Sequence, residues 1–205
     1  MALADLLYRC PRCGFDPMEG DGDEASCPAC RTGFARGRGN RVLLERRPDG
    51  GTVETPVAAL VGLIEASGGP LTRARRPDGS IGYSAEVDIS WRVAEEPVHH
   101  KGALKGFSEI MGEPAAGILT VDEDAVTVRT EGKGESEWRF LEIRALQTSS
   151  SSLQLSLPDD QLVQFRFRGD SPRRWEDLMR HLLREAYRRA GKGNVVEFQP
   201  RIVTE

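Results

Sequence analysis

The sequence predicts an α+β protein in which a small cysteine-bearing lobe precedes an antiparallel sheet closed by one helix. Three observations predict this fold class. All four cysteines fall within the first 30 residues, in two identically spaced pairs. From Tyr83 onward, apolar and polar side chains alternate with the period of two that is typical of half-buried strands. Between Trp175 and Tyr187, apolar residues instead recur at helical spacing.

The four cysteines form two Cys-Pro-x-Cys turns with thirteen residues between them. Each turn can point two thiolates at one ion, and four thiolates make the closed tetrahedral site that structural Zn²⁺ prefers. A closed site stabilises a small fold and has no open position for substrate. The same ligands would suit a rubredoxin-like iron site, and a redox dithiol or disulfide would require an oxidising compartment. The sequence therefore predicts one structural zinc ion with Cys10, Cys13, Cys27 and Cys30 as its ligands.

The paired turns resemble those of the zinc-ribbon family, which carries two Cys-Pro-x-Cys knuckles on antiparallel hairpins. The resemblance covers roughly the first forty residues and implies a metal-stabilised lobe, which we place at residues 1–47. Phe15 and Phe34 occupy similar places after the two knuckles, and we expect both to fill the core of the lobe. Because so small a lobe buries too little surface to fold alone, metal loss should unfold it and spare the rest of the chain.

Residues 48–80 are expected to connect the lobe to the sheet through turns and a short helix. The sequence Arg-Arg-Pro-Asp-Gly occurs twice, at 46–50 and at 75–79. Pro presets the turn and Gly supplies its left-handed residue, so each copy predicts the tip of a β-hairpin. The predicted hairpins join 41–45 to 52–55 and 71–75 to 80–85.

A short apolar helix is predicted between these two turns, over residues 57–66. Thr55 is a candidate N-cap, and Pro56 suits the first helical position because an N–H there would have no helical partner. The glycine pair Gly68-Gly69 follows, which is typical of a helix end.

Residues 81–192 are predicted to form one antiparallel domain, followed by a tail over 193–205. Clean alternation over 85–93 indicates a half-buried strand. Residues 99–114 show no regular pattern and are expected to be irregular, whereas 138–146 is expected to form a strand. Two further hairpins are predicted around acidic turns, at 122–124 and at 158–160.

One amphipathic helix is predicted to close this domain. Ser171 is its N-cap, Pro172 its first residue, and Gly191 ends it. Five arginines lie mainly off its apolar face, and we expect them to form a solvated face, with an anion- or partner-binding face as the alternative. These are Arg173, Arg180, Arg184, Arg188 and Arg189. The apolar stripe, which we expect to be core, consists of Trp175, Leu178, Met179, Leu182, Leu183, Ala186 and Tyr187.

A meander of strands closed by an amphipathic C-terminal helix resembles the pleckstrin-homology superfold, including its bacterial and GRAM-type relatives. Trp175, near the start of the helix, matches the tryptophan with which those domains plug one end of the barrel. The resemblance covers about residues 81–192 and implies an antiparallel β-barrel or sandwich with a binding role. The family binds phosphoinositides through a basic run in the first strand–strand loop, where this chain offers only Lys101 and Lys105.

The net charge of −4 is unevenly distributed along the chain. Residues 31–47 hold six arginines and one acid, and Arg36 and Arg38 among them could follow a phosphate backbone. The six carboxylates of residues 1–30 and the formal −2 charge of a four-thiolate zinc site would repel nucleic acid, so we expect no strong binding to it. Anionic lipid would require a denser basic cluster than Lys101 and Lys105 provide.

These patterns favour a non-catalytic zinc-binding adaptor or scaffolding protein, in which the pleckstrin-homology-like domain binds a protein or peptide. No nucleotide-binding, metalloprotease or serine-hydrolase motif occurs, and the neighbouring His99 and His100 are expected to be exposed loop residues. The absence of a long apolar run and of a signal-like N-terminus indicates a cytoplasmic protein with no transmembrane segment, and we expect a bacterial one. The alternatives are a zinc-ribbon nucleic-acid-binding regulator and a membrane-lipid-binding module.

Overall fold

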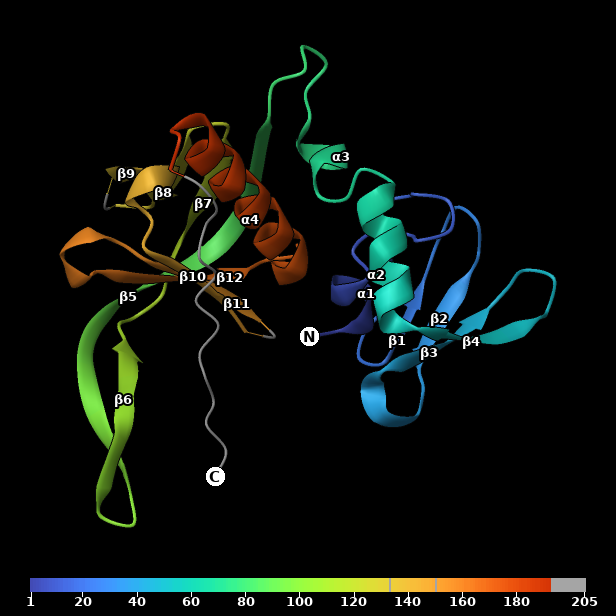
Figure 1. Cartoon of the computed structure of the whole chain (residues 1–205), viewed down its shortest axis with the longest axis horizontal. Coiled ribbons are helices and arrows are strands. Elements are labelled where there is room, and N and C mark those ends of the chain that lie inside the picture. Colours follow the sequence, from blue (N-terminus) through green and yellow to red (C-terminus); the bar gives the residue numbers. More distant parts are fainter. Residues whose placement is uncertain (133, 150, 193–205) are drawn as a thin grey trace.

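The computed structural model describes residues 1–132, 134–149 and 151–192. It shows a mixed α+β protein with two antiparallel sheets, each of which has its own hydrophobic core (Figure 1). The two sheets lie in two parts of the chain that meet at the N-terminal end of helix α4 (Pro172–Arg189). The predicted tail, 193–205, lies outside the described residues.

The first part is a four-stranded antiparallel sheet in the order β1-β2-β3-β4, with two helices against it. Leu3, Phe34 and Leu60, from α1, β2 and α2, are at most 2% exposed and share one core. The core thus includes α2, which lies in the segment predicted to be a connector. The elements are α1 (Leu3–Leu6), β1 (Glu24–Ser26), β2 (Gly33–Arg36), η1 (Arg38–Asn40), β3 (Val42–Arg46), β4 (Thr52–Pro56) and α2 (Val57–Ala66).

The two Arg-Arg-Pro-Asp-Gly turns have different surroundings. The first joins β3 to β4 as the predicted hairpin. The second hairpin prediction is wrong, because Leu71–Ala74 forms helix α3 and an isolated bridge between Arg75 and Ile81 closes the turn. Pro70 already has helical dihedrals and Ala74 is fully buried, so packing of the helix replaces the expected strand.

Helix α2 covers the predicted residues, but its start differs from the prediction. Pro56 keeps an extended ψ of 136° and ends β4, so the helix begins at Val57. The Thr55 hydroxyl donates to Glu45 Oε2 at 3.3 Å and does not cap the helix. The helix ends at the glycine pair as predicted, because Gly68 and Gly69 both have positive φ.

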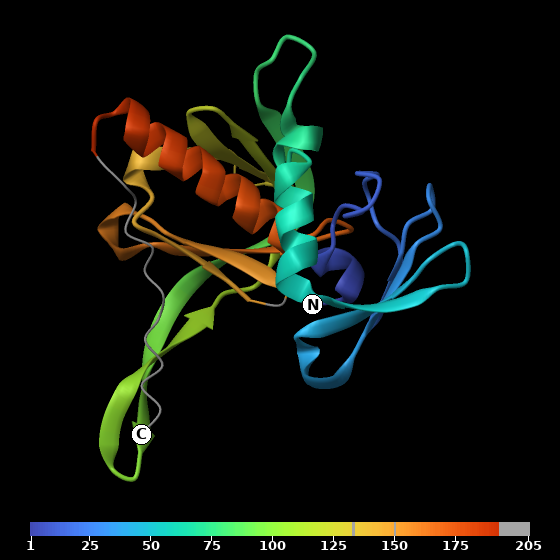
Figure 2. The same ribbon diagram turned by 45° about the vertical axis from the view of Figure 1, so that its right-hand side comes forward.

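The second part is an eight-stranded antiparallel sheet that curls into a half-barrel, with α4 across its open side (Figures 1 and 2). The strand order is β10-β11-β12-β5-β7-β8-β9, and β6 pairs with β5 outside this path. The elements are α3, β5 (Gly82–His100), β6 (Ala103–Met111), β7 (Ala115–Asp122), β8 (Ala125–Thr130), β9 (Gly134–Arg139), η2 (Phe140–Glu142), β10 (Ala145–Thr148), β11 (Ser152–Ser156), η3 (Pro158–Asp160), β12 (Leu162–Phe167) and α4.

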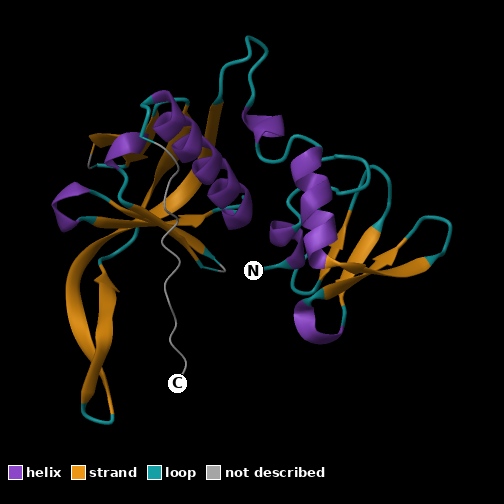
Figure 3. Ribbon diagram, in the orientation of Figure 1, coloured by secondary structure: helices purple, strands orange, loops and turns teal. Residues whose placement is uncertain are grey.

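Strand β5 organises this sheet. It pairs with β7 up to Ile89 and with β12 up to Trp91, and it continues as a two-stranded ribbon with β6 (Figure 3). The strand predicted over 85–93 is therefore present and longer than expected. The expectation that 99–114 is irregular is wrong, because this segment contains the turn and the second strand of the ribbon. Most of its side chains are exposed, so no buried face imposes a regular alternation.

The acidic turns are where the sequence predicts them, joining β7 to β8 and β11 to β12. Asp122 Oδ1 accepts the N–H groups of Asp124 and Ala125, which closes the first turn. The prediction of a single strand over 138–146 is wrong. β9 ends at Arg139, and the following 3₁₀ turn buries Phe140 completely before β10 begins. Burial of this aromatic ring requires the chain to leave the extended conformation.

Helix α4 begins and ends as predicted. Ser171 Oγ accepts the Arg174 N–H at 3.1 Å, and Gly191, with a φ of 66°, follows the last turn. The predicted apolar stripe is buried in the core, apart from Tyr187, which is only partly buried.

Trp175 is fully buried in the first turns of α4. Its ring stacks on Phe167 and packs against Tyr83, each with 5.3 Å between ring centroids. Its Nε1 donates to Asp170 Oδ2 at 2.8 Å, and the Tyr83 hydroxyl donates to the same oxygen at 2.9 Å. The tryptophan therefore fastens the helix to the sheet by both packing and hydrogen bonding.

Trp175→Ala is expected to lower the free energy of unfolding by about 3–5 kcal/mol, the usual loss when a large buried aromatic is removed. Arg184, at an exposed position of the same helix, provides the control, and Arg184→Ala should change stability by less than about 1 kcal/mol. Denaturant titration followed by circular dichroism measures both. Equally small losses would show that α4 is not docked on the sheet.

Candidate metal centre

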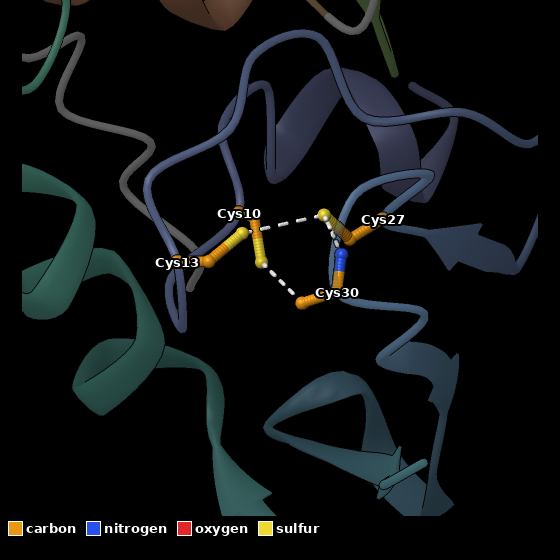
Figure 4. A group of neighbouring side chains, drawn as sticks. All are labelled: Cys10, Cys13, Cys27 and Cys30. Carbon is orange, nitrogen blue, oxygen red and sulfur yellow. Dashed lines mark hydrogen bonds between the residues drawn. The ribbon is translucent and has the colours of Figure 1, made fainter.

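The two knuckles place the four cysteine sulfur atoms within 4.8 Å of one another (Figure 4). The first pair lies in the turn after α1, and the second lies at the tip of the β1–β2 hairpin. Cys10 Sγ is 3.7 Å from Cys30 Sγ, and Cys13 Sγ is 3.5 Å from Cys27 Sγ. With Zn–S bonds of about 2.3 Å, the edge of a tetrahedral four-sulfur site is about 3.8 Å. The four side chains are therefore positioned to bind one metal ion.

The backbone of the two knuckles is built in the same way. Gly14 and Arg31 each follow the second cysteine with positive φ, and each donates its N–H to the carbonyl of the first cysteine. The N–H groups of Arg12 and Cys30 point at the sulfur of the first cysteine in their own knuckle, at 3.4 and 3.5 Å. Donors of this kind orient a metal ligand and stabilise its charged form.

The thiols differ in burial and in acidity. Cys10 and Cys27 are buried, and burial raises the pKa of both thiols. Burial acts in the same direction on Cys30, but its hydrogen bonds with Thr32, Cys13 and Cys27 together outweigh it and lower the pKa of Cys30 to about 6. A metal ion supplies the positive charge that the buried pair needs to exist as thiolates at neutral pH.

An ion pair fixes the first knuckle to the sheet. Arg12, between the first two cysteines, donates from Nε and Nη2 to the two carboxylate oxygens of Glu45 in β3, at 2.9 and 2.5 Å. The Glu45 side chain is 1% exposed, and its hydrogen bonds with Arg12 hold the pKa of this carboxyl below its ordinary value. The paired contact fixes both the distance and the orientation of the knuckle.

The two phenylalanines after the knuckles differ in burial. Phe34 points into the core of the first part and is 2% exposed, as expected. The expectation for Phe15 is wrong, because its side chain is 41% exposed. Leu3 and Leu7, which lie in and directly after α1, fill the core, and the sequence pattern of so short a helix gave no sign of this.

The basic candidates for ligand binding lie in separate places. Arg36 forms an ion pair with Asp23 at 2.7 Å, so a carboxylate already occupies it. Arg38 is exposed in η1, on the same part of the molecule. Lys101 and Lys105 are exposed at the tip of the β5–β6 ribbon, on the other part. The structure therefore brings together the four cysteines but not the four basic residues.

His99 and His100 are exposed, as expected. They end β5 and pair with Leu104 and Ala103 of β6, so they belong to a strand and not to a loop.

The residues that join the two parts were not predicted from the sequence. Arg174 of α4 is 2% exposed and donates from Nη1 and Nη2 to the two carboxylate oxygens of Asp16, at 2.5 and 2.6 Å. Nη2 also donates to the Tyr8 carbonyl at 3.2 Å, and Nε lies 3.1 Å from Asp170 Oδ1. Burial alone would lower the pKa of Arg174, but hydrogen bonding to Asp16 together with the neighbouring charges of Asp170 and Asp16 raises it. A buried ion pair thus crosses the junction.

This ion pair connects the metal centre to the second part. Asp16 lies three residues after Cys13, and its side chain is 5% exposed. A knuckle folded around a metal ion holds this carboxylate where the buried charge of Arg174 needs it. In contrast to the expectation from the sequence, metal loss should therefore also weaken the docking of α4, because Arg174 would lose Asp16 and keep only Asp170 as a carboxylate partner.

Comparison with known proteins names no family for this chain. Neither a known protein family nor a curated protein matches the sequence. Among solved structures, the C-terminal domain of an unknown protein from Leishmania infantum matches at 13% identity, over 55% of this chain and 95% of that chain, with a TM-score of 0.32. A TM-score this low does not establish a shared fold. Within the described residues, no helix combines the length and apolar character needed to cross a membrane.

Asp16→Ala is expected to lower the free energy of unfolding by up to about 3–5 kcal/mol, because it removes the two-oxygen partner of a buried guanidinium and leaves Asp170 as its remaining carboxylate. Removing both charges in Asp16→Leu with Arg174→Met should recover much of that loss. The exposed Asp21 provides the control, and Asp21→Ala should change stability by less than about 0.5 kcal/mol. Denaturant titrations of the four proteins measure the effects. An Asp16→Ala loss no larger than the control's would contradict a buried pair.

Proposed function

We propose that this chain is a non-catalytic zinc-binding adaptor whose second part binds an extended peptide of a protein partner. The donor set supports zinc, because four cysteine sulfurs at nearly tetrahedral spacing match its structural sites. A structural role is supported by the place of Cys10 and Cys27, which belong to the hydrophobic core of the first part. An ion held by four thiolates has no position left for a substrate.

The strand order supports a pleckstrin-homology-like second part. β5, β7, β8 and β9 follow one another as one antiparallel run, β10, β11 and β12 form a second run, and β12 pairs back onto β5. Helix α4 closes the curled sheet, with Trp175 stacked at its first turns. The β5–β6 ribbon is an addition to this pattern, because it lengthens the first strand before the meander continues.

A groove between the last turns of α4 and the edge of the sheet carries the proposal. Its lining includes the apolar Ala125, Leu141 and Ala186, of which Leu141 is the most exposed, at 40%, whereas Phe140 is fully buried. The charged residues of the lining are Asp122, Asp124, Glu137, Arg139 and Arg189. An exposed apolar side chain among charged ones suits a peptide that places one apolar residue against it.

The strand beside this groove offers backbone groups as well. β9 ends the strand order, and among the described residues it pairs with β8 alone. An extended peptide can add to such an edge through main-chain hydrogen bonds while its alternate side chains enter pockets. Arg189 already pairs with Asp124 at 3.1 Å, so the remaining carboxylates favour a peptide with a basic flank.

Zinc content tests the metal part of the proposal. Protein purified without added metal is expected to contain about one zinc ion per chain by elemental analysis, because all four ligands are in place. Cys10→Ser with Cys13→Ser should abolish it, since half of the ligands are removed. Less than about half an equivalent in the unaltered chain, with four readily titrating thiols, would contradict a structural zinc site.

Peptide selection tests the binding part. We expect a random phage-displayed library panned on the whole chain to yield peptides with an apolar residue next to Lys or Arg. Leu141→Glu should weaken binding of these peptides at least about tenfold, because it replaces the exposed apolar side chain of the groove with a charge. The matched control is Ile118→Glu, at a 44% exposed position of β7 that does not line the groove. This variant should bind the selected peptides as tightly as the unaltered chain does. If the selected peptides bound both variants with equal affinity, the peptide site would lie outside this groove.

A further inference from the structure

The β5–β6 ribbon beyond Trp91 forms an arm, which we define as residues 93–100 and 103–110. It projects from the sheet away from the first part of the molecule (Figures 1 and 2). Within the described residues, its two strands pair only with each other, so the arm has two open backbone edges. An isolated two-stranded ribbon is marginally stable in water, and a long one therefore benefits from a partner.

Apolar side chains on the arm are left in solvent. Val93 is 67% exposed, Phe107 61%, Leu104 54% and Val98 45%. These four are among the most exposed large apolar side chains of the described chain, and all lie on one short ribbon. Exposed apolar surface concentrated in this way indicates an interaction site.

Charge is segregated along the same arm. The base of the arm is acidic, with Glu95 and Glu96 on β5 and Glu109 on β6. The tip is basic, with Lys101 in the turn and Lys105 just after it. The apolar Val98 and Phe107 lie between the two ends, in adjacent rungs of the ribbon. The arm therefore runs from acidic through apolar to basic.

We propose that the arm is a dimerisation element that packs against the arm of a second copy of this chain. A two-fold interface must be complementary to itself, because each residue meets the symmetry-related surface. Two arms laid antiparallel place the basic tip of one on the acidic base of the other. The axis then passes through the middle of the arm, where Phe107 meets Phe107 of the second copy. Phe107 shares its face of the ribbon with Pro97, whereas Val98, one rung away, lies on the opposite face. The charge order of the arm thus selects a second copy over an unrelated protein.

The base of the arm is already fixed for such docking. Arg92, whose side chain is 13% exposed, contacts Glu95 and Glu109, which stand directly opposite each other in the ribbon. Its Nη2 lies 2.6 Å from Asp160 Oδ2 in the turn before β12, which ties the arm to the sheet. The guanidinium offsets repulsion between the two carboxylates. A pre-oriented arm loses less conformational freedom on association.

Dimerisation would leave the groove beside α4 accessible, because the arm points away from it (Figure 1). A dimer would then carry two peptide grooves and bind partners with repeated motifs more tightly than a single copy. This consequence rests on the proposed function, whereas the dimer itself does not.

Sedimentation equilibrium of the whole chain with complementary charge reversals tests the proposal. Variant A carries Lys101→Glu and Lys105→Glu, and variant B carries Glu95→Lys and Glu96→Lys. The unaltered chain is expected to be dimeric, whereas A and B alone should each dissociate at least about tenfold more readily, because like charges then face each other across the axis. An equimolar mixture of A and B should restore the dimer, since every acidic end then meets a basic one.

Two further proteins complete the test. Glu19→Lys with Glu54→Lys makes the same change in net charge as variant B on exposed positions of the first part, and it should remain dimeric. Phe107→Ser should dissociate the dimer without any change in charge. A monomeric unaltered chain at about 100 μM overturns the proposal, and so does a mixture of A and B that stays monomeric while circular dichroism shows both folded. If either charge variant fails to fold, a Phe107→Ser protein that stays dimeric overturns the proposal and a folded monomer supports it.

Discussion

The ion pair between Arg174 and Asp16 determines how the rest of the molecule can be arranged. A guanidinium that is 2% exposed is tolerated only if carboxylates and carbonyls surround it, and here they come from both parts of the chain. The Arg174 guanidinium also lies over the Tyr8 ring at 5.0 Å, and Ser171 Oγ donates to the Asp5 carbonyl at 2.5 Å. The N-terminal end of α4 is thus complete only when the cysteine-bearing part is folded against it.

This dependence extends the influence of the metal centre beyond its own sheet. The first knuckle is held on one side by Arg12 and Glu45, and the chain leaves it toward Asp16. On the far side of α4's first turn, Asp170 accepts hydrogen bonds from Tyr83 and Trp175. A continuous set of polar contacts therefore leads from the knuckle through Arg174 to the residues that fasten α4 to the sheet. We therefore expect metal binding and closure of the half-barrel to be parts of one folding equilibrium.

Local patterns predicted the parts of this structure in which one face is buried. The strands around Asp122 and Pro158 alternate because their inward side chains form the core, and the cysteine turns are recognised by spacing alone. The arm escaped prediction because neither of its faces is buried. The junction between the two parts was not predicted, because Asp16 and Arg174 are 158 residues apart in the sequence. In addition, Arg174 resembles the other arginines of an amphipathic helix. Position on the helix does not reveal which arginine a distant carboxylate will cover.

Arginine side chains make the junctions between separate segments of this chain. Arginine accounts for 24 of the 28 basic residues. Arg12, Arg92 and Arg174 each bind carboxylates from a different segment of the chain, as a planar fork with several donors can do. A lysine is a strongly hydrated point charge that cannot bridge in this way, but it suits an exposed contact that forms and dissociates. Two of the three lysines in the described residues lie at the arm tip. A basic charge there suits the proposed dimer, and no contact within the chain needs the several donors of an arginine.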